Sequence, residues 1–334
     1  MLTSDFQYDL PERAIAQSAI EPRHAARLLD TRTMEDHVVA DLPSLLAPGD
    51  LLVVNNTRVR RARLAATKDT GGAVEVLLLR PHPPGSWQAL VRPGRRVRRG
   101  TRLAAGPVAF EVDHSLTDGV VVLKVVGGSV EEAMDSIGMI PLPPYFHGQL
   151  SDPERYQTVY ARREASAAAP TAGLHFTAEL ITALAGRNIM MTAVDLEIGL
   201  DTFRPIAAER ITDHAMHRER VIVGEEAVSA IAAAQARGGR IVAIGTTVVR
   251  SLESAAAGGA LRPFDGFTDL FIAPGHQFRV VDALVTNFHV PGSTLVVLVA
   301  AFMGPEWRRA YETALGRGYR FLSFGDAMLV ERRR

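Results

Sequence analysis

Three polar loops, each interrupted by glycine or proline, combine residue types that can hold a substrate and move protons. The first, residues 168–177 (AAPTAGLHFT), contains His175 and ends at Thr177, a suitable N-cap for the amphipathic run that follows. This loop is expected to place an imidazole beside the free amides of a helix N-terminus, where an anionic or polarised group can bind. A buried histidine that is satisfied by a backbone carbonyl is the alternative interpretation of His175.

The other two loops follow the same plan of strand, polar turn and helix. Residues 282–294 pass from an apolar strand to a turn that holds His289, and then to an apolar helix capped by Ser293 or Thr294. Residues 239–253 pass from an apolar strand to a Gly-Thr-Thr turn and then to a helix. Ligands of open α/β folds collect at the carboxyl ends of strands. We therefore expect the three loops to form one site.

Residues 60–130 predict a small antiparallel β-barrel. Short runs with two-residue alternation of apolar side chains are separated by Gly and Pro turns, and no helix-length periodic segment interrupts them. The expected strands span residues 74–79, 87–91, 108–112 and 120–126.

The remainder predicts an α/β domain with a largely parallel sheet, because apolar strands alternate with amphipathic helices. The expected strands are 51–54, 189–196, 241–244 and 283–288, and the expected helices are 177–186, 225–237, 247–257, 293–302 and 306–315. We expect a discontinuous α/β domain of residues 1–59 and 131–334, with residues 60–130 inserted as the second domain.

Composition is that of an ordinary globular protein. The 334 residues are 47% hydrophobic and 22% charged, which suits one or two domains with a substantial core. The absence of cysteine excludes disulfides, thiolate metal sites and cysteine nucleophiles. The first residues, MLTSDF, lack a secretory pattern, and no apolar run approaches the roughly 18 residues of a membrane-spanning helix. We expect a cytoplasmic protein that does not enter a membrane.

Charge is balanced overall, with 37 Lys and Arg against 37 Asp and Glu. Proteins that bind nucleic acid along a large surface are usually basic, so this balance argues mildly against such binding. Residues 92–102 are a local exception, because they include Arg95, Arg96, Arg98 and Arg99. Guanidinium groups suit phosphates, which favours a nucleic-acid contact there. A solvated hairpin surface is the alternative.

Neither a metal site nor a Rossmann site is indicated. His214 and His217 lie three residues apart, a spacing that suits zinc only on a helix, and no His-Glu-x-x-His pattern is present. We expect no metal. No Gly-x-Gly-x-x-Gly follows a strand, and Gly245 alone does not make a dinucleotide site.

Long motifs throughout the chain are similar to those of one family. They include FQYDLP from residue 6, NNTRV from 55, TGGAVE from 70, IPLPPY from 140, DPERYQTVYA from 152, PTAGLHFT from 170, HAMHRE from 214, GTT from 245, TNFH from 286, and YRF with GDAM from 319. The chain resembles the S-adenosylmethionine:tRNA ribosyltransferase-isomerase family of queuosine biosynthesis from residue 6 to about residue 330.

The resemblance implies a barrel-like α/β main domain with an inserted small antiparallel β-barrel domain. It implies S-adenosylmethionine as co-substrate and ribosyl donor, and no metal. The acceptor would be the aminomethyl group of 7-aminomethyl-7-deazaguanine in the anticodon region of tRNA, with epoxyqueuosine, adenine and methionine as products. Such a reaction needs a base beside the acidified 5′ carbon, a donor for the departing adenine, and a site that excludes water.

Candidate residues follow from these loops and motifs. The catalytic candidates are His175, His289, His217 and Glu197. The substrate-binding candidates are Thr171, Gly173, Asn55, Asn56, Thr246, Thr247, Asn287 and Glu219. The nucleic-acid-binding candidates are Arg95, Arg96, Arg98 and Arg99.

Two positions depart from the family pattern. In the stretch 196–203 (LEIGLDTF), Glu197 stands where the family usually has histidine, and Asp201 where it has glycine. An ionised carboxylate only accepts hydrogen bonds, whereas an imidazole titrates near neutrality. The tRNA-modifying enzyme is the main hypothesis. These departures and the balanced charge support an alternative: an S-adenosylmethionine-dependent paralogue with a small-molecule acceptor. A non-catalytic tRNA-binding relative is a third possibility, against which the histidine loops argue.

Overall fold

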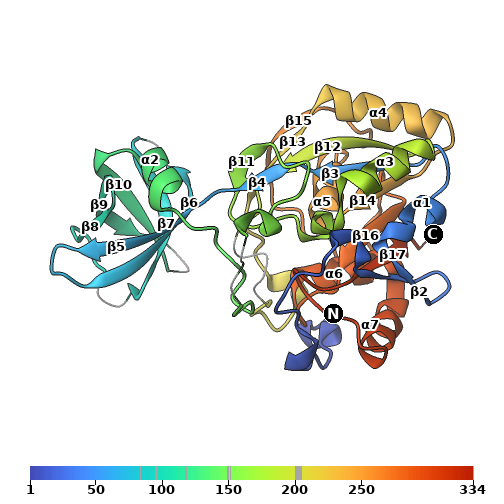
Figure 1. Ribbon diagram of the computed structural model, residues 1–334, viewed down its shortest axis with the longest axis horizontal. Coiled ribbons are helices and arrows are strands. Elements are labelled where there is room, and N and C mark those ends of the chain that lie inside the picture. Colours follow the sequence, from blue (N-terminus) through green and yellow to red (C-terminus); the bar gives the residue numbers. More distant parts are fainter. Residues whose placement is uncertain are drawn as a thin grey trace. The chain divides into compact units, whose positions relative to one another are not determined.

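The computed structural model describes residues 1–82, 84–94, 97–116, 119–148, 150, 152–199 and 205–333. The chain divides into two compact units (Figure 1). The main unit comprises Met1–Arg58 and Pro143–Arg334, and the inserted unit comprises Val59–Leu142.

A nine-stranded mixed sheet forms the centre of the main unit. Its strand order is β15-β13-β12-β3-β14-β16-β17-β1-β2. The bounds are β1 Arg27–Asp30, β2 Glu35–Val38, β3 Leu51–Asn55, β12 Met190–Leu196, β13 Glu219–Val223, β14 Ile241–Ile244, β15 Phe264–Thr268, β16 Ala283–Asn287 and β17 Ala327–Glu331. Strands β4 (Thr57–Val59) and β11 (Arg163–Ser166) form a separate two-stranded sheet.

The large sheet is less parallel than the sequence predicts. The four central strands β12, β3, β14 and β16 are parallel, but β16 pairs with β17 in antiparallel orientation, as do β12 with β13 and β13 with β15. Two helices rather than one separate β16 from β17, so the connection is not a simple strand-helix-strand crossover. The strand that follows therefore runs in the opposite direction.

Helices cover both faces of the sheet. They are α1 Leu42–Leu45, α3 Ala178–Gly186, α4 Glu225–Ala236, α5 Thr246–Ala255, α6 Thr294–Met303 and α7 Trp307–Gly316. Leu51 and Val53 of β3 pack in one hydrophobic cluster with α4, α5, α6 and α7, whereas Leu52 and Val54 pack in another with α1 and α3. Successive strand residues point to opposite faces, so both faces of β3 are buried.

The two expected helix caps are confirmed. The hydroxyl of Thr177 accepts a hydrogen bond from the amide of Leu180 at 3.2 Å, and α3 follows. Ser293 rather than Thr294 caps α6, and its hydroxyl accepts from the amide of Val296 at 3.4 Å. Both loops therefore deliver polar residues to a helix N-terminus.

The inserted unit is a closed antiparallel β-barrel, which confirms the expected fold. Its strand order is β10-β7-β6-β5-β8-β9. The bounds are β5 Arg63–Lys68, β6 Ala73–His82, β7 Ser86–Arg92, β8 Arg102–Ala105, β9 Val108–Ser115 and β10 Val120–Gly128, with helix α2 at Val130–Ile137. Among the residues described for either unit, no helix is long and apolar enough to cross a bilayer.

Candidate active site

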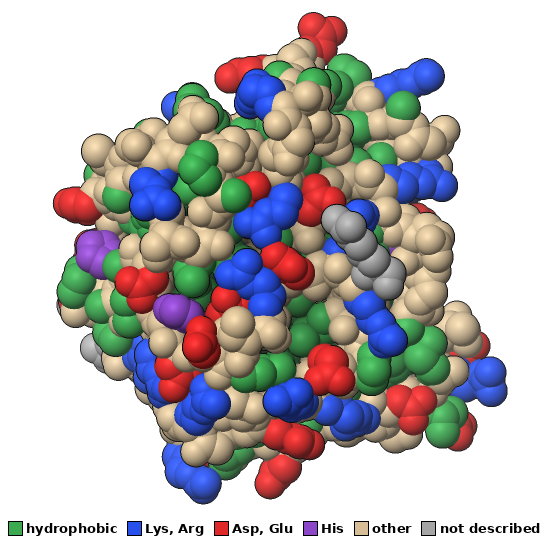
Figure 2. Space-filling model, turned by 90° about the vertical axis from the view of Figure 1, so that its right-hand side faces the viewer, with side chains coloured by type: hydrophobic (Ala, Val, Ile, Leu, Met, Phe, Trp, Pro, Cys, Tyr) green, Lys and Arg blue, Asp and Glu red, His purple; other side chains and the backbone are tan. Residues whose placement is uncertain are grey.

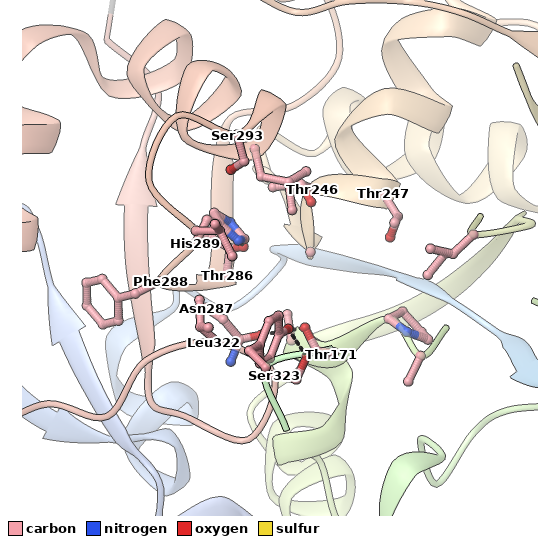
Figure 3. Close-up of a pocket in the computed structure, with 18 residues that line it drawn as sticks. Thr171, Thr246, Thr247, Thr286, Asn287, Phe288, His289, Ser293, Leu322 and Ser323 are labelled. Atoms are coloured by element: carbon pink, nitrogen blue, oxygen red, sulfur yellow. Dashed lines mark hydrogen bonds between the residues drawn. The ribbon is translucent and has the colours of Figure 1, made fainter. Parts of the chain in front are cut away.

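A cavity in the main unit lies where the three polar loops meet (Figure 3). It contains about 580 Å³ of free space, its open mouth included. The loops contribute residues 169–172, 245–247 and 286–290, together with Ser293. Because these segments follow strands or begin helices, the cavity lies at the carboxyl ends of the central strands β14 and β16.

The cavity lining carries no formal charge. Among the described residues around it, none is Asp, Glu, Lys or Arg, and the polar groups are hydroxyls, the amide of Asn287 and the imidazole of His289. The hydroxyls belong to Tyr145, Thr171, Thr246, Thr247, Thr286, Ser293 and Ser323. Proton transfer by a lining side chain therefore depends on His289 or on a hydroxyl.

His289 lies two residues after the end of β16 and is 8% exposed. Its Nε2 lies 3.0 Å from Oγ1 of Thr286, beside it on the same wall of the cavity (Figure 3). The His289 amide donates to the hydroxyl of Tyr311 at 3.2 Å, and its carbonyl accepts from the hydroxyl of Tyr8. Burial lowers the pKa of His289 to about 3, so the ring is neutral at pH 7.

His175 lies outside this cavity. It ends the 3₁₀ turn η8 (Thr171–His175) and lines a smaller hollow of about 230 Å³ together with Arg23 and Arg155. Burial, helped by the charge of Arg320, lowers the pKa of His175 to about 4, and a hydrogen bond with the backbone of Arg23 opposes this shift. His175 is therefore also a neutral imidazole at pH 7.

Asn287 connects the cavity to His175. Its Oδ1 accepts from the hydroxyl of Thr171 at 2.8 Å. Its Nδ2 donates to Nε2 of His175 and to the carbonyl of Asp326, both at 3.2 Å. These three contacts fix the orientation of the Asn287 amide. His175 can therefore influence the cavity indirectly, through its contact with Asn287.

Gly173 is enclosed by aromatic and threonine side chains. A Cβ atom placed on Gly173 would lie 2.0 Å from the hydroxyl oxygen of Tyr160 and 2.9 Å from Cγ2 of Thr158. The residue does not line the cavity, and its lack of a side chain allows η8 to pack against Tyr160.

Asn55 and Asn56 lie at the end of β3, away from the cavity lining. The amide group of Asn55 donates to the carbonyl of Leu196 at 3.0 Å, and its oxygen accepts from the Leu196 amide at 3.2 Å. The backbone amide of Asn56 donates to the carbonyl of Val194 at 3.1 Å. Both residues thus hold the end of β3 against β12.

Glu197 pairs with Arg163. Its carboxylate lies 2.9 Å from the guanidinium, which also contacts Asp195 at 2.7 Å. The next residue, Ile198, lines the cavity, whereas Glu197 does not. The Glu197 carboxylate, at the position that departs from the family pattern, therefore pairs with Arg163. Asp201, the second departing residue, lies outside the described residues.

Glu219 is a buried anchor for the loop that follows β12. Its carboxylate pairs with Arg250 of α5 and accepts from the amide of Gly199 at 3.0 Å. His217 precedes β13 and is exposed, in a segment, 214–218, that is irregular rather than helical. His214 and His217 consequently do not share a helix face. Neither His217 nor Glu219 lines the cavity.

Arg98 and Arg99 are exposed on the connection between β7 and β8. Arg95 and Arg96 lie outside the described residues. Figure 2 shows acidic and basic side chains interspersed over one face of the molecule, in keeping with the net charge of zero. Any affinity for phosphates must therefore come from local clusters such as this connection.

Tyr145 and Ser323 are among the polar lining residues that are not site candidates from the sequence. The hydroxyls of Tyr145 and Ser323 lie 2.6 Å apart. Leu322, which precedes Ser323, has a φ of +70°, a conformation that leucine rarely adopts. Leu322 lines the cavity beside Ser323, and no periodicity in the sequence signals this conformation.

The fold and this site define an α/β protein with an inserted β-barrel and a neutral, histidine-containing cavity at its strand ends. Residues 3–330 match the family described as queuosine biosynthesis protein, and the chain belongs to this family.

Named relatives match along the whole chain. The S-adenosylmethionine:tRNA ribosyltransferase-isomerase of Symbiobacterium thermophilum is 48% identical over 351 residues, covering 99% of this chain and 100% of that protein. The protein of the same name from an Anaeromyxobacter species is 50% identical over 343 residues, covering 99% of each.

A solved structure agrees with the fold. The crystal structure of S-adenosylmethionine tRNA ribosyltransferase from Thermotoga maritima has a TM-score of 0.56 at 37% identity, and the match covers 98% of this chain and 99% of that chain. Nothing in these comparisons supports a small-molecule acceptor.

Proposed function

We propose that this chain transfers the ribosyl group of S-adenosylmethionine to the aminomethyl group of 7-aminomethyl-7-deazaguanine in tRNA and isomerises it to epoxyqueuosine, with release of adenine and methionine. The observation that carries the proposal is the single cavity formed by all three polar loops, with His289 as its only imidazole among the described lining residues. Membership of the queuosine biosynthesis family and the names of the relatives support it.

S-adenosylmethionine fits the cavity as co-substrate. The polar groups and apolar side chains of its lining match the parts of this molecule. Apolar walls suit the adenine and the carbon skeleton, and hydroxyls suit the ribose; the apolar lining includes Ile198, Phe288, Val290, Leu295 and Leu322. The chemistry needs a base and hydroxyl donors, and we propose no metal.

His289 removes the first proton. The sulfonium acidifies the 5′ carbon beside it, so a neutral base at that carbon can begin the reaction. Burial lowers the pKa of His289 to about 3, so the ring is unprotonated but weakly basic, and the step relies on the acidity that the sulfonium gives the 5′ carbon. When Nε2–H donates to the hydroxyl of Thr286, the other nitrogen, Nδ1, carries the lone pair that accepts the proton.

Ser293 assists the departure of adenine. Its oxygen accepts from the amide of Val296, which leaves its own proton available for a ring nitrogen of the leaving base. Asn287 holds its position through Thr171 and His175, so His175 acts as a positioning residue. Water is kept out by the apolar walls while the ribose opens and recloses.

The acceptor is presented by tRNA, whose phosphates the exposed Arg98 and Arg99 contact, together with Arg95 and Arg96. A tRNA acceptor implies a cytoplasmic location. The inserted unit would then function as an RNA-binding domain, and Met1–Arg58 with Pro143–Arg334 as the catalytic domain.

The decisive experiment measures adenine and methionine release by mass spectrometry with S-adenosylmethionine, in the presence and absence of tRNA that carries the aminomethyl deazaguanine. We expect release that depends on this tRNA, and loss of at least 100-fold in His289→Gln. His37→Gln, a change on the edge strand β2, is the matched control and should retain activity. Release without any tRNA, or full activity in His289→Gln, would contradict the proposal.

A further inference from the structure

Helix α5 begins at the cavity without a capping side chain. Its N-cap is Gly245, with a φ of +97°, and no side chain that the structure describes caps its first turn. The amides of the first helical residues, Thr246 and Thr247, have no partner within the helix. Aligned peptide dipoles give such an end a partial positive charge.

Thr247 carries an unused donor at the same place. Its side chain lines the cavity and is only 9% exposed, yet its hydroxyl has no hydrogen-bond partner among the described residues. A buried hydroxyl without a partner costs free energy unless a ligand pairs with it. Figure 3 places Thr246 and Thr247 together at the start of α5.

Helix α6 also begins at this cavity. One of its first-turn amides already has a partner, because the hydroxyl of Ser293 accepts from the Val296 amide. No Lys or Arg is among the described lining residues. Positive potential in the cavity is therefore concentrated at the start of α5, where an amide pair and a hydroxyl can meet two oxygens of one anion.

We propose that the N-terminus of α5, with the Thr247 hydroxyl, binds an oxyanion of the substrate. This inference rests on the proposed function, under which the oxyanion is the carboxylate at the methionyl end of S-adenosylmethionine. One carboxylate oxygen accepts from the amides of Thr246 and Thr247, and the other accepts from the Thr247 hydroxyl. A phosphate of the RNA offers the same chemistry, and binding measurements separate the two sources.

The test uses isothermal titration calorimetry on the wild-type protein and three variants, with S-adenosylmethionine, its decarboxylated analogue and tRNA as ligands. S-adenosylmethionine and its decarboxylated analogue differ in the carboxylate alone. Wild-type protein should bind S-adenosylmethionine at least tenfold more tightly than the analogue. Thr247→Val should weaken S-adenosylmethionine about tenfold and leave the analogue within twofold. Thr247→Ser should retain the preference, and Thr294→Val, at the start of α6 but outside the lining, should behave as wild type.

Each outcome has a distinct meaning. An equal loss for S-adenosylmethionine and its analogue in Thr247→Val would overturn the inference, because the substitution would then act through cavity shape. Weaker binding of tRNA with unchanged S-adenosylmethionine affinity would assign the oxyanion to a phosphate and overturn the carboxylate assignment. Wild-type protein that binds neither S-adenosylmethionine nor its analogue would instead refute the proposed function. If Thr247→Val does not fold, Thr247→Ala makes the same comparison.

Discussion

The side-chain amide of Asn287 donates to Nε2 of His175 across 3.2 Å, so a histidine outside the cavity orients a group that lines it. The sequence places both residues in polar loops 112 positions apart. Only the fold shows that His175 contacts Asn287 and that Asn287 in turn lines the cavity. The donor must be the amide, which requires an unprotonated Nε2 on His175. Burial provides this by lowering the pKa of His175 to about 4.

Removal of either member of this pair should therefore have the same effect. His175→Ala and Asn287→Ala should each lower kcat for adenine release by roughly 10- to 100-fold, because misplaced groups lose catalytic geometry. The double variant should be no slower than the slower single variant, since both act through one hydrogen bond. The kcat values are measured at saturating S-adenosylmethionine. If the loss of kcat in the double variant equals the product of the two single losses, His175 has an independent catalytic role.

Acid should destabilise the protein through its buried histidines. The pKa of His289 is about 3 and that of His175 about 4, whereas the unfolded chain has histidine pKa values near 6.5. Between pH 6.5 and about 4, these two histidines are protonated in the unfolded state but remain neutral in the native state. The free energy of unfolding therefore falls as the pH falls from about 6.5 toward 4. Each histidine contributes up to about 1.4 kcal/mol per pH unit.

Urea titrations at several pH values check this effect. His289→Gln removes one titrating group, so its unfolding free energy should fall less steeply with acid than that of the wild type. Thr182→Ala, an exposed change on α3 that removes no titrating group, should keep the wild-type slope. Parallel slopes for wild type and His289→Gln would show that this ring is protonated normally in the native state.

Gly173 should not tolerate a side chain. Gly173→Ala places a Cβ 2.0 Å from the hydroxyl oxygen of Tyr160, so we expect a loss of roughly 1–3 kcal/mol in the free energy of unfolding. Tyr160→Phe removes that oxygen and should restore part of the loss in the double variant. The same Ala substitution at the exposed Gly186, which has open space beside it, should be neutral. A double variant as unstable as Gly173→Ala would exclude Tyr160 as the cause.

Regular elements could be predicted from the sequence where the apolar period was long. Helices α3 to α7 and the central strands β3, β12, β14 and β16 lie within about two residues of their expected bounds. The strands β1, β2, β13, β15 and β17 were not predicted. Charged residues or glycine interrupt β2, β13 and β15, which therefore lack the continuous apolar run that marks the equally short β3, β14 and β16. Helix α2 was not predicted either, although Ser129 and Glu132 form an N-cap motif at its start.

The meeting of the three loops was predictable, because strand ends of a sheet lie together. Which side chains face the cavity was not predictable. His175 and Gly173 share a motif with Thr171, yet only Thr171 lines the cavity, since η8 turns its last residues toward Arg23 and Tyr160. That division depends on the direction of a single 3₁₀ turn, which no spacing rule fixes.

The arginines of the inserted unit should contribute to RNA affinity through ion release. Arg98→Gln with Arg99→Gln should weaken tRNA binding and reduce the slope of log K against log salt by about 1 to 2, because two phosphate contacts would be lost. Fluorescence anisotropy over a range of salt concentrations measures the slope. Arg187→Gln with Arg309→Gln removes the same charge from the main unit and should leave the slope unchanged. Equal slopes for all three proteins would remove the connection between β7 and β8 from the RNA interface.

Glu197 tests the departure from the family pattern. Its carboxylate lies 2.9 Å from Arg163 and outside the cavity lining, so we expect it to orient Arg163 rather than to accept a proton. Glu197→Gln keeps the shape and a hydrogen-bond acceptor but cannot serve as a base. Adenine release should therefore stay within about threefold, which corresponds to less than about 1 kcal/mol in the activation barrier. Asp195→Asn, which alters the other carboxylate on the same guanidinium, is the matched control and should also stay within about threefold. A loss of 100-fold or more in Glu197→Gln alone, with S-adenosylmethionine affinity intact, would place this carboxylate in the proton transfer and reduce the role assigned to His289.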